Sequence, residues 1–244
     1  MGEASGGRYV ESAGARIHHE ITGLGPTVLL THGFGETLRV WDGQISALTG
    51  VRRLATWDIR GHGDTMTPDT DEAFSRPATL GDMAAVLDAA GTPQAVVGGS
   101  SLGGYLSLAF ALARPERVQG LLLFNTGPGY RDDSARAGWN AFAERIARRN
   151  ERESHTGLAR AARGILMQSD SDVIDSLPAI TVPTLVLVGE HDRPFRAAAD
   201  YLAAKIQGAS KVVIPGAKHH PNVEQADAFN RVVLDFLNDR CSSR

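Results

Sequence analysis

The sequence predicts an α/β fold, a mostly parallel, doubly wound sheet flanked by helices. Three observations indicate this class. Short runs of Val, Leu and Ile alternate along the chain with longer segments whose apolar residues recur at helical spacing. Several of the short runs are continuously apolar, as is typical of strands buried on both faces of a sheet. Loops built from turn residues such as Gly, Asp and Asn follow these runs.

The first part of the chain predicts a hairpin followed by parallel strands. Residues 9–21 alternate weakly between apolar and polar and break at Ala13-Gly14, which indicates an opening hairpin. Residues 27–30 (Thr-Val-Leu-Leu) form a short apolar run that we expect to be a buried strand. A helix around 41–48 then leads to a strand at 53–59.

A change to helical spacing follows. From Thr79 the apolar residues lie on one helical face, with Thr79-x-x-Asp82 as a capping signal and Gly91 as a stop. The next stretch, 95–113, has no charged residue and is long enough for a membrane span. Because its four glycines and three serines interrupt the apolar run, we expect a buried strand and a buried helix instead.

The second half continues the alternation and contains an insertion. We expect strands at 118–124, 184–188 and 211–214, and helices at 197–206 and 229–237. Residues 128–177 break the rhythm, are rich in Arg, Ala, Glu and Ser, and are predicted to be helical around 137–149 and 157–167. They are interpreted as a small helical cap inserted into a core made of residues 1–127 and 178–244. Such insertions cover the crevice where open α/β sheets bind ligands.

Composition narrows the class of protein. The 244 residues are 42% hydrophobic and 22% charged, as in a globular domain that carries an insertion. A net charge of −3 predicts no general attraction to nucleic acid or to an anionic membrane. Cys241 is the single cysteine, which excludes an internal disulfide framework and favours a reducing compartment. Met1–Tyr9 is rich in Gly and Ser without the apolar core of a signal peptide, so we expect a cytoplasmic protein.

A motif at 99–103 predicts a nucleophile. Gly99-x-Ser101-x-Gly103 lies between an expected strand and an expected helix, and it matches the G-x-S-x-G nucleophile elbow. A strand that turns sharply into a helix holds its apex residue in a strained conformation, with glycine on either side to avoid clashes. Ser101 is therefore the nucleophile candidate. Centring the motif on Ser100 would require glycine in place of Leu102.

Further motifs surround the elbow in the order expected for one protein family. They are His32-Gly33, Arg60-Gly61-His62-Gly63, Gly189-Glu190-His191-Asp192 and Pro215-Gly216-Ala217-Lys218-His219. Together with the elbow, they resemble the α/β-hydrolase superfamily over nearly the whole chain, and the order Ser, Asp, His is the one that this fold uses. Within the superfamily the chain is most similar to small bacterial esterases, enol-lactonases and related carboxylic ester hydrolases.

The resemblance implies a role for each site residue. Ser101 is the nucleophile, His219 the base that activates it, and Asp192 the acid that orients His219. The backbone N–H groups of Phe34 and Leu102 form the oxyanion hole, and Phe34 also lines the acyl pocket. The implied reaction is hydrolysis of a small carboxylic ester or lactone through an acyl-serine intermediate.

Other residues of catalytic type are expected to have different roles. Glu190 precedes the proposed acid, His62 and His191 pack loops, and His32 shapes the oxyanion loop. We expect three histidines to lie at the surface: His18, His19 and His155. We expect three carboxylates of the cap to be solvated: Asp170, Asp172 and Asp175. The cap also carries six arginines: Arg145, Arg148, Arg149, Arg152, Arg160 and Arg163. They either recruit a carboxylate-bearing substrate or form a solvated face that is paired with nearby glutamates, and we favour the solvated face.

No metal or cofactor is expected, because the sequence has no His-Glu-x-x-His, paired Cys-x-x-Cys or phosphate-binding loop. Serine rather than aspartate at the elbow also argues against the epoxide hydrolase and haloalkane dehalogenase branches. Two alternatives to ester hydrolysis are C–C bond hydrolysis of a small diketone-like acid and a ligand sensor that retains the same residues. Turnover of p-nitrophenyl esters beyond one equivalent distinguishes the enzyme from the sensor.

Overall fold

The computed structural model describes residues 8–241 and contains one sheet. Most of the N-terminal segment on which the lack of a signal peptide was predicted, residues 1–7, lies outside these described residues. The strands are β1 (Arg8–Ser12), β2 (Ala15–Thr22), β3 (Thr27–Thr31), β4 (Arg53–Trp57), β5 (Ala95–Ser100), β6 (Val118–Phe124), β7 (Thr184–Gly189) and β8 (Ser210–Ile214).

The eight strands have the order β1-β2-β4-β3-β5-β6-β7-β8. β1 pairs with β2 and β2 with β4 in antiparallel fashion, while every other pairing is parallel. The hairpin predicted at the start of the chain is β1 and β2. The predicted fold class, a mostly parallel sheet flanked by helices, is confirmed.

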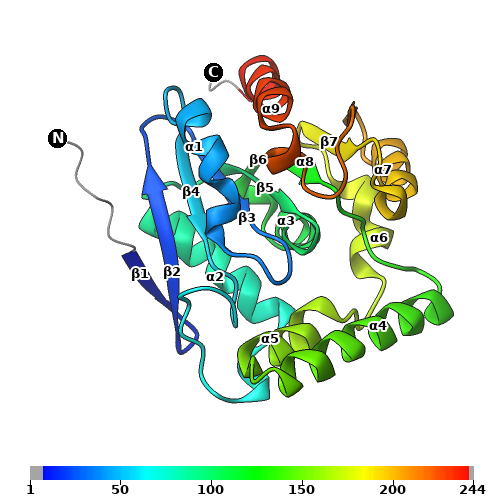
Figure 1. Ribbon diagram of the computed structural model, residues 1–244. Helices are drawn as coiled ribbons and strands as arrows, with labels where there is room; N and C mark the ends of the chain where they lie inside the picture. Colours follow the sequence, from blue (N-terminus) through cyan, green and yellow to red (C-terminus); the bar gives the residue numbers. More distant parts are fainter. Residues whose placement is uncertain (1–7, 242–244) are drawn as a thin grey trace.

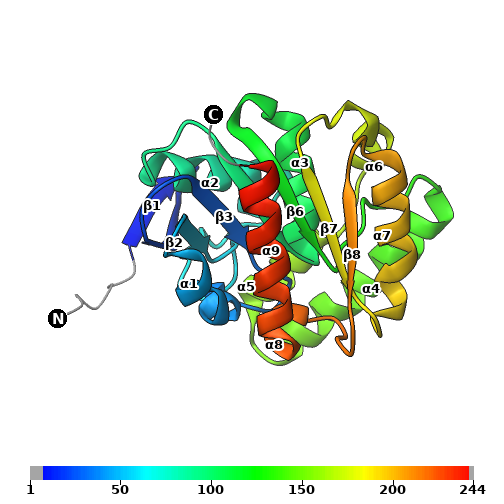
Figure 2. The same ribbon diagram turned by 90° about the horizontal axis from the view of Figure 1, so that it is seen from above.

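Helices cover both faces of the sheet (Figures 1 and 2). One face packs against α1 and α9, and the other against α2, α3 and α7. The helices and short helical turns of the core are η1 (Leu38–Trp41), α1 (Asp42–Leu48), η2 (Asp71–Ala73), α2 (Arg76–Ala89), α3 (Leu102–Ala113), η3 (Pro115–Arg117), α7 (Arg193–Lys205), α8 (Pro221–Glu224) and α9 (Ala226–Arg240).

The continuous apolar runs follow from this double covering. Successive side chains of a strand point to opposite faces of the sheet. In β6, Leu121 and Leu123 join the cluster beneath α2, α3 and α7, whereas Leu122 and Phe124 join the cluster beneath α1 and α9. Because helices exclude water from both faces of the sheet, the covered positions of such a strand need apolar residues. The uncharged stretch 95–113 is β5 followed by α3, as predicted.

The expected cap helices lie between β6 and β7. They are α4 (Asp133–Arg152), α5 (Thr156–Ala161), a π-helical turn η4 (Ala162–Leu166), α6 (Asp172–Ser176) and η5 (Leu177–Ala179). Figure 1 shows α4 and α5 together, on the opposite side of the molecule from α9. The division into a core of 1–127 and 178–244 and a cap of 128–177 stays a prediction.

The predicted start of the helix at Thr79 is wrong. Helix α2 begins at Arg76, and its N-cap is Ser75, whose Oγ accepts a hydrogen bond from the Ala78 N–H at 3.3 Å. Thr79 donates its hydroxyl to the Ser75 carbonyl, one turn back. Asp82 is not part of a capping box, because it forms a fully buried ion pair with Arg60. The predicted capping box at Thr79 and Asp82 is therefore replaced by the N-cap at Ser75.

A short helix, α8, precedes the predicted last helix. Asn222 lies inside α8 and donates its Nδ2 to the Val40 carbonyl at 2.8 Å. Helix α9 begins at Ala226. No helix in residues 8–241 is long and apolar enough to cross a membrane.

Candidate active site

Ser101 lies at the sharp turn between β5 and α3. Its φ of +52° and ψ of −114° belong to a conformation that a residue with a side chain rarely adopts. The flanking glycines are required by contact with β3. A Cβ on Gly99 would lie 2.3 Å from the Thr31 carbonyl oxygen, and one on Gly103 would lie 2.1 Å from the same atom. The geometry gives the physical reason for the Gly-x-Ser-x-Gly spacing.

Hydrogen bonds from neighbouring strands hold this strained residue. The Ser101 N–H donates to the Phe124 carbonyl at 2.9 Å, and the Thr126 hydroxyl donates to the Ser101 carbonyl at 2.6 Å. Ser101 lines a cavity, whereas the Ser100 hydroxyl is buried and has no hydrogen-bond partner within residues 8–241. Of the two adjacent serines, Ser101 is therefore the one placed to meet a substrate.

His219 and Asp192 come together from two different loops. The His219 Nδ1 lies 2.7 Å from the Asp192 Oδ2. Since a carboxylate only accepts hydrogen bonds, Nδ1 carries the proton and the lone pair of Nε2 is left free to accept one. Asn125 donates its Nδ2 to the same Asp192 oxygen at 2.5 Å and to the Lys218 carbonyl at 3.0 Å. This amide ties the acid to the loop that carries His219.

Aromatic rings fix the orientation of the His219 ring. The Phe195 ring centroid lies 5.0 Å from it, tilted by 33°, and the His220 ring meets it edge-on at 5.1 Å. His220 in turn places its Nδ1 3.0 Å from the Glu36 Oε1. The two adjacent histidines thus face different partners.

The two proposed oxyanion donors lie on the same cavity as Ser101 and His219. Leu102 is the first residue of α3, so its N–H has no intrahelical acceptor. Phe34 follows Gly33, whose N–H donates to the Glu36 Oε2 at 2.7 Å. Glu36 therefore fixes one end of the loop that carries the Phe34 N–H. Stabilisation of an oxyanion by Phe34 and Leu102 stays a prediction.

The cavity of Ser101 has a volume of about 610 Å³. Its walls come from the core loops, from α4 on one side and from α7 on the other. Trp139, Phe142 and Ile146 of α4 face Phe195 and its neighbours on α7. A cavity of this size and apolar character is typical of small-molecule sites.

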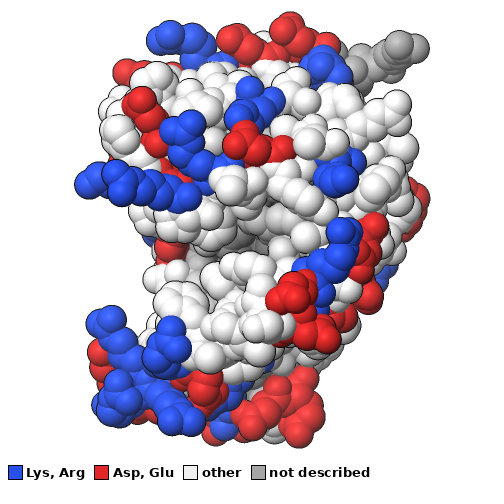
Figure 3. All heavy atoms as spheres, turned by 90° about the vertical axis from the view of Figure 1, so that its right-hand side faces the viewer, with Lys and Arg blue, Asp and Glu red and all other residues white. Residues whose placement is uncertain are grey.

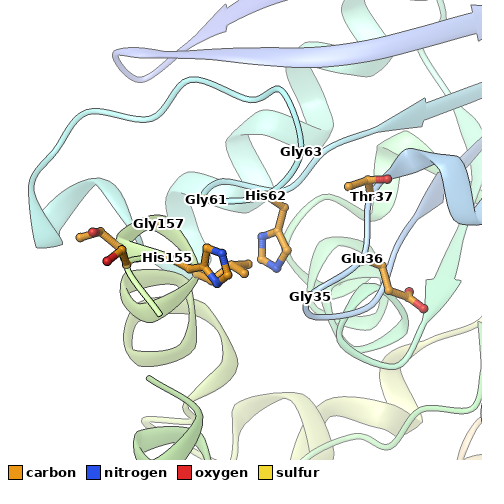
Figure 4. Close-up of a pocket in the computed structure, with 11 residues that line it drawn as sticks. Gly35, Glu36, Thr37, Gly61, His62, Gly63, His155 and Gly157 are labelled. Carbon is orange, nitrogen blue, oxygen red and sulfur yellow. The ribbon is translucent and has the colours of Figure 1, made fainter. Parts of the chain in front are cut away.

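A second cavity, of about 520 Å³, is lined by the segments 35–37, 61–63 and 154–158 (Figure 4). His62 and His155 project into it from the core and from the cap, and the glycines Gly35, Gly61, Gly63 and Gly157 form much of its wall. His62, which lines this second cavity, meets the Phe34 ring of the first cavity edge-on at 5.2 Å. Neither Ser101 nor His219 lines this second space.

The expected surface position is wrong for two histidines. His18 and His19 are only 5% and 2% exposed, because both lie on β2 where β1 and β4 flank it. The His18 Nδ1 lies 2.8 Å from the Asp58 Oδ2. His155 is exposed, as predicted. The alternation of apolar and polar residues along 9–21 is too weak to predict that two histidines of β2 are buried.

His32 and His62 are buried beneath the oxyanion loop. His32 accepts the Ile59 N–H at its Nε2 at 3.0 Å and donates its Nδ1 to the Gly33 carbonyl at 2.6 Å. Burial lowers the pKa of both rings, and for His62, which also faces His32, to about 3. Both are therefore neutral rings that shape loops, in keeping with the structural role predicted for them.

Three polar residues near the site were not identified from the sequence. Asn125, Thr126 and Glu36 each bond a site loop, as described above. The first two directly follow β6, and polar residues at the carboxyl end of a buried strand are the signal that marks them. Glu36 had no comparable signal: its partner Gly33 lies in its own loop, and its other partner, His220, lies in a loop that is distant in the sequence.

The charged residues of the cap form ion pairs. Asp170 is not simply solvated as expected: Arg76 of the core pairs with it at 2.7 Å and lowers its pKa to about 2. The arginine face is paired with carboxylates, as in Arg148 with Glu144 and Arg149 with Glu153, each at 2.9 Å and four residues apart. Arg163 joins Glu144 and Glu151. The favoured interpretation, a solvated face of ion pairs, fits these contacts.

Comparison with known proteins finds relatives that share the α/β-hydrolase fold. A family model described as the alpha/beta hydrolase fold matches residues 26–159. A provisionally named carbamate hydrolase, RutD, of Variovorax paradoxus is 31% identical over 261 residues, covering 91% of this chain and 96% of that protein. Named epoxide hydrolases also match, over about half of this chain, as in a protein of Rattus norvegicus at 36% identity over 51% of it.

Two solved structures are similar over nearly their whole length. The enol-lactonase of Burkholderia xenovorans LB400 has a TM-score of 0.78 and 28% identity, covering 95% of this chain and 100% of that one. A thermophilic esterase of Thermogutta terrifontis has a TM-score of 0.82 and 27% identity, covering 98% and 100%.

Proposed function

We propose that this chain, which belongs to the α/β-hydrolase fold family, is a serine hydrolase that cleaves a small carboxylic ester or lactone. The observation that carries the proposal is the convergence of Ser101, His219 and Asp192. Ser101 and His219 line one cavity, and Asp192 holds His219 in the tautomer that leaves Nε2 free. A serine hydroxyl is too weak a nucleophile at neutral pH without such a base.

In the first half of the reaction Ser101 is acylated. Its Oγ attacks the ester carbonyl carbon while His219 Nε2 takes the hydroxyl proton. The negative charge that develops on the carbonyl oxygen is stabilised by the N–H groups of Phe34 and Leu102. The C–O bond to the alcohol then breaks, and His219 gives its proton to the leaving oxygen. With a lactone, the alcohol remains attached to the acyl group.

In the second half a water molecule releases the acid. His219 takes a proton from the water as its oxygen attacks the acyl carbon. The bond to Ser101 Oγ breaks, and the proton returns to the serine. Asp192 keeps its negative charge throughout and stabilises the imidazolium that forms twice in each cycle. No cofactor enters either step.

Two relatives support ester or lactone chemistry. The structures at 27% and 28% identity are named as an esterase and an enol-lactonase, and each is covered completely. Serine at the elbow favours this chemistry over epoxide opening, for which an aspartate nucleophile is expected in this fold. The resemblance to the carbamate hydrolase makes carbamates a useful comparison substrate.

The test combines active-site labelling with turnover. A fluorophosphonate should modify the peptide that carries Ser101, and p-nitrophenyl butyrate should be turned over well beyond one equivalent of enzyme. A burst that stops at one equivalent would instead indicate a ligand sensor. Hydrolysis of a diketone-like acid without ester turnover would indicate C–C bond cleavage. An adduct on Ser100 would overturn the assignment of the elbow.

A further inference from the structure

The cavity of Ser101 has no Lys, Arg, Asp or Glu in its lining among the residues that the structure describes. Figure 3 views the molecule from the side where α7 and α4 lie, and it shows a hollow whose walls are uncharged, with the charged residues above and below it. Aromatic and aliphatic side chains make up most of the wall, and among the described residues its titratable side chains are the imidazole of His219 and the phenols of Tyr105 and Tyr130. A substrate carboxylate in this space would have no cation to pair with.

Two arginines contact side chains of this wall, and both have other partners. Arg76 donates to the Tyr105 hydroxyl at 3.0 Å, but its guanidinium is paired with both carboxylate oxygens of Asp170. Arg145 stacks over the Phe142 ring at 5.7 Å, on the outer side of the wall. These contacts leave the cavity with a neutral lining, since a buried charge without a partner is strongly unfavourable.

Gln168 supplies a neutral donor in this wall. Its main-chain N–H and carbonyl are both bonded to the Asn140 side chain, each at 2.8 Å. Its Oε1 accepts the Tyr130 N–H at 3.2 Å, which fixes the amide so that the oxygen faces Tyr130. The Nε2 is then the end of the amide that no hydrogen bond within residues 8–241 satisfies. Gln168 lines the cavity and is only 8% exposed.

We propose that the substrate of Ser101 is an uncharged ester or lactone with an apolar body, and that Gln168 binds a neutral acceptor oxygen on it. Esters that place a carboxylate between α4 and α7 are excluded. The inference rests on the proposed ester hydrolysis and adds the substrate class to it. Arg148, Arg149 and Arg163 do not take part in recognition, because they are paired with glutamates.

The first experiment compares two esters of equal length on the unmodified protein. 4-Nitrophenyl hexanoate ends in a methyl group and mono-4-nitrophenyl adipate in a carboxylate, so only the terminal group differs. We expect kcat/KM for the adipate to be at least ~100-fold lower, since the carboxylate loses its water without gaining a cation. Equal values, with Ser101 labelled by fluorophosphonate, would overturn the substrate class and leave the hydrolase proposal standing. No labelling and no turnover of either ester would overturn both.

A pair of variants tests the same point by adding a charge. Phe142 is 42% exposed and lines the cavity, so a polar residue is tolerated there. Phe142→Lys should raise the ratio of adipate to hexanoate turnover by roughly tenfold, because it supplies the missing cation. The matched variant Phe142→Gln should not raise this ratio. The same rise in both variants would mean that lost bulk, and not charge, controls access.

A third ester tests Gln168. The methyl ester of the 4-nitrophenyl adipate is neutral and carries an acceptor oxygen that the hexanoate lacks. Gln168→Met keeps the length of the side chain and removes the donor, so turnover of this diester relative to the hexanoate should fall by roughly tenfold. An unchanged ratio in a variant with normal fluorophosphonate labelling would remove Gln168 from recognition.

Discussion

The core loops around the candidate site and the outer face of the cap use charged side chains in opposite ways. In the core, Asp58, Asp82 and Arg60 are at most 2% exposed, and each is bonded on several sides. On α4, the ion pairs of Arg148 and Arg149 lie at the surface, with more than half of each arginine side chain exposed.

This difference has an energetic meaning. A buried ion is costly to leave without its partner, whereas an exposed pair exchanges its partner for water with little loss. Polar groups that fix reactive loops must therefore be held by several partners, while those on the cap are free to vary. The comparison teaches that the burial of a charged residue, and not its charge alone, determines how much its replacement lowers the stability of the protein.

The largest effect is expected at the elbow. Replacing Ser101 with Ala should lower kcat/KM for p-nitrophenyl butyrate at least ~1,000-fold, about 4 kcal/mol of transition-state stabilisation, without unfolding the protein. Ser100→Ala is the matched control, because the Ser100 hydroxyl makes no hydrogen bond in the described structure and Ser100 does not line the cavity. Near-normal turnover by Ser101→Ala would contradict the mechanism.

The adjacent histidines provide the next test. His219→Ala should abolish turnover, because the base that pairs with Asp192 is lost. His220→Ala removes the contact with Glu36 and one of the two rings beside His219 but leaves the His219–Asp192 pair, so it should cost at most roughly tenfold, about 1.4 kcal/mol. Both are checked by steady-state kinetics on a short-chain ester. The reverse ranking would place the base one residue further along the loop.

Stability should separate the buried and exposed ion pairs. Arg60→Met leaves the Asp82 carboxylate buried without its cation, and we expect a loss of about 3–5 kcal/mol in the free energy of unfolding. Arg149→Met on α4 is the matched control and should shift the midpoint of thermal unfolding by less than about 2 °C. Urea and thermal unfolding measure both. Similar losses in the two variants would remove the distinction between core and cap.

Acid should weaken the core through His62. Its pKa of about 3 in the folded protein lies below the ordinary value of 6.5, so the unfolded chain binds a proton first as the pH falls. Stability is full above pH 6.5 and decreases between pH 6.5 and about 3. At pH 5 this group accounts for a loss of about 2 kcal/mol relative to pH 7.

Urea unfolding at pH 7 and pH 5 checks this expectation. His62→Asn keeps a donor for the Arg60 carbonyl but has no titrating ring, so its stability should fall less over the same range. An NMR titration of the wild-type protein gives a second measurement, in which the His62 ring should remain neutral at pH 5. Protonation of that ring near pH 6.5 would refute the prediction.

Local sequence determined the elbow and the sheet. Gly99, Ser101 and Gly103 encode a turn whose geometry depends on the absence of Cβ atoms, so their spacing is readable from the chain alone. The buried strands are equally readable, because the positions of a strand that are covered on both faces need apolar residues, as in residues 121–124 of β6. The α/β-hydrolase resemblance added the loops that carry Asp192 and His219, which the structure joins by a hydrogen bond.

Contacts between distant segments were decided only by the tertiary structure. The sequence around Asp82 is typical of a capping residue, yet Asp82 forms an ion pair with Arg60, which is 22 residues away. His18 is buried because strands on both sides cover β2, which no feature of its own neighbours indicates. The Gln168 amide is held by the Tyr130 N–H, 38 residues earlier, because the fold brings these two segments together. Local propensity acts over a few residues, whereas burial and polar pairing depend on which segments the finished fold brings together.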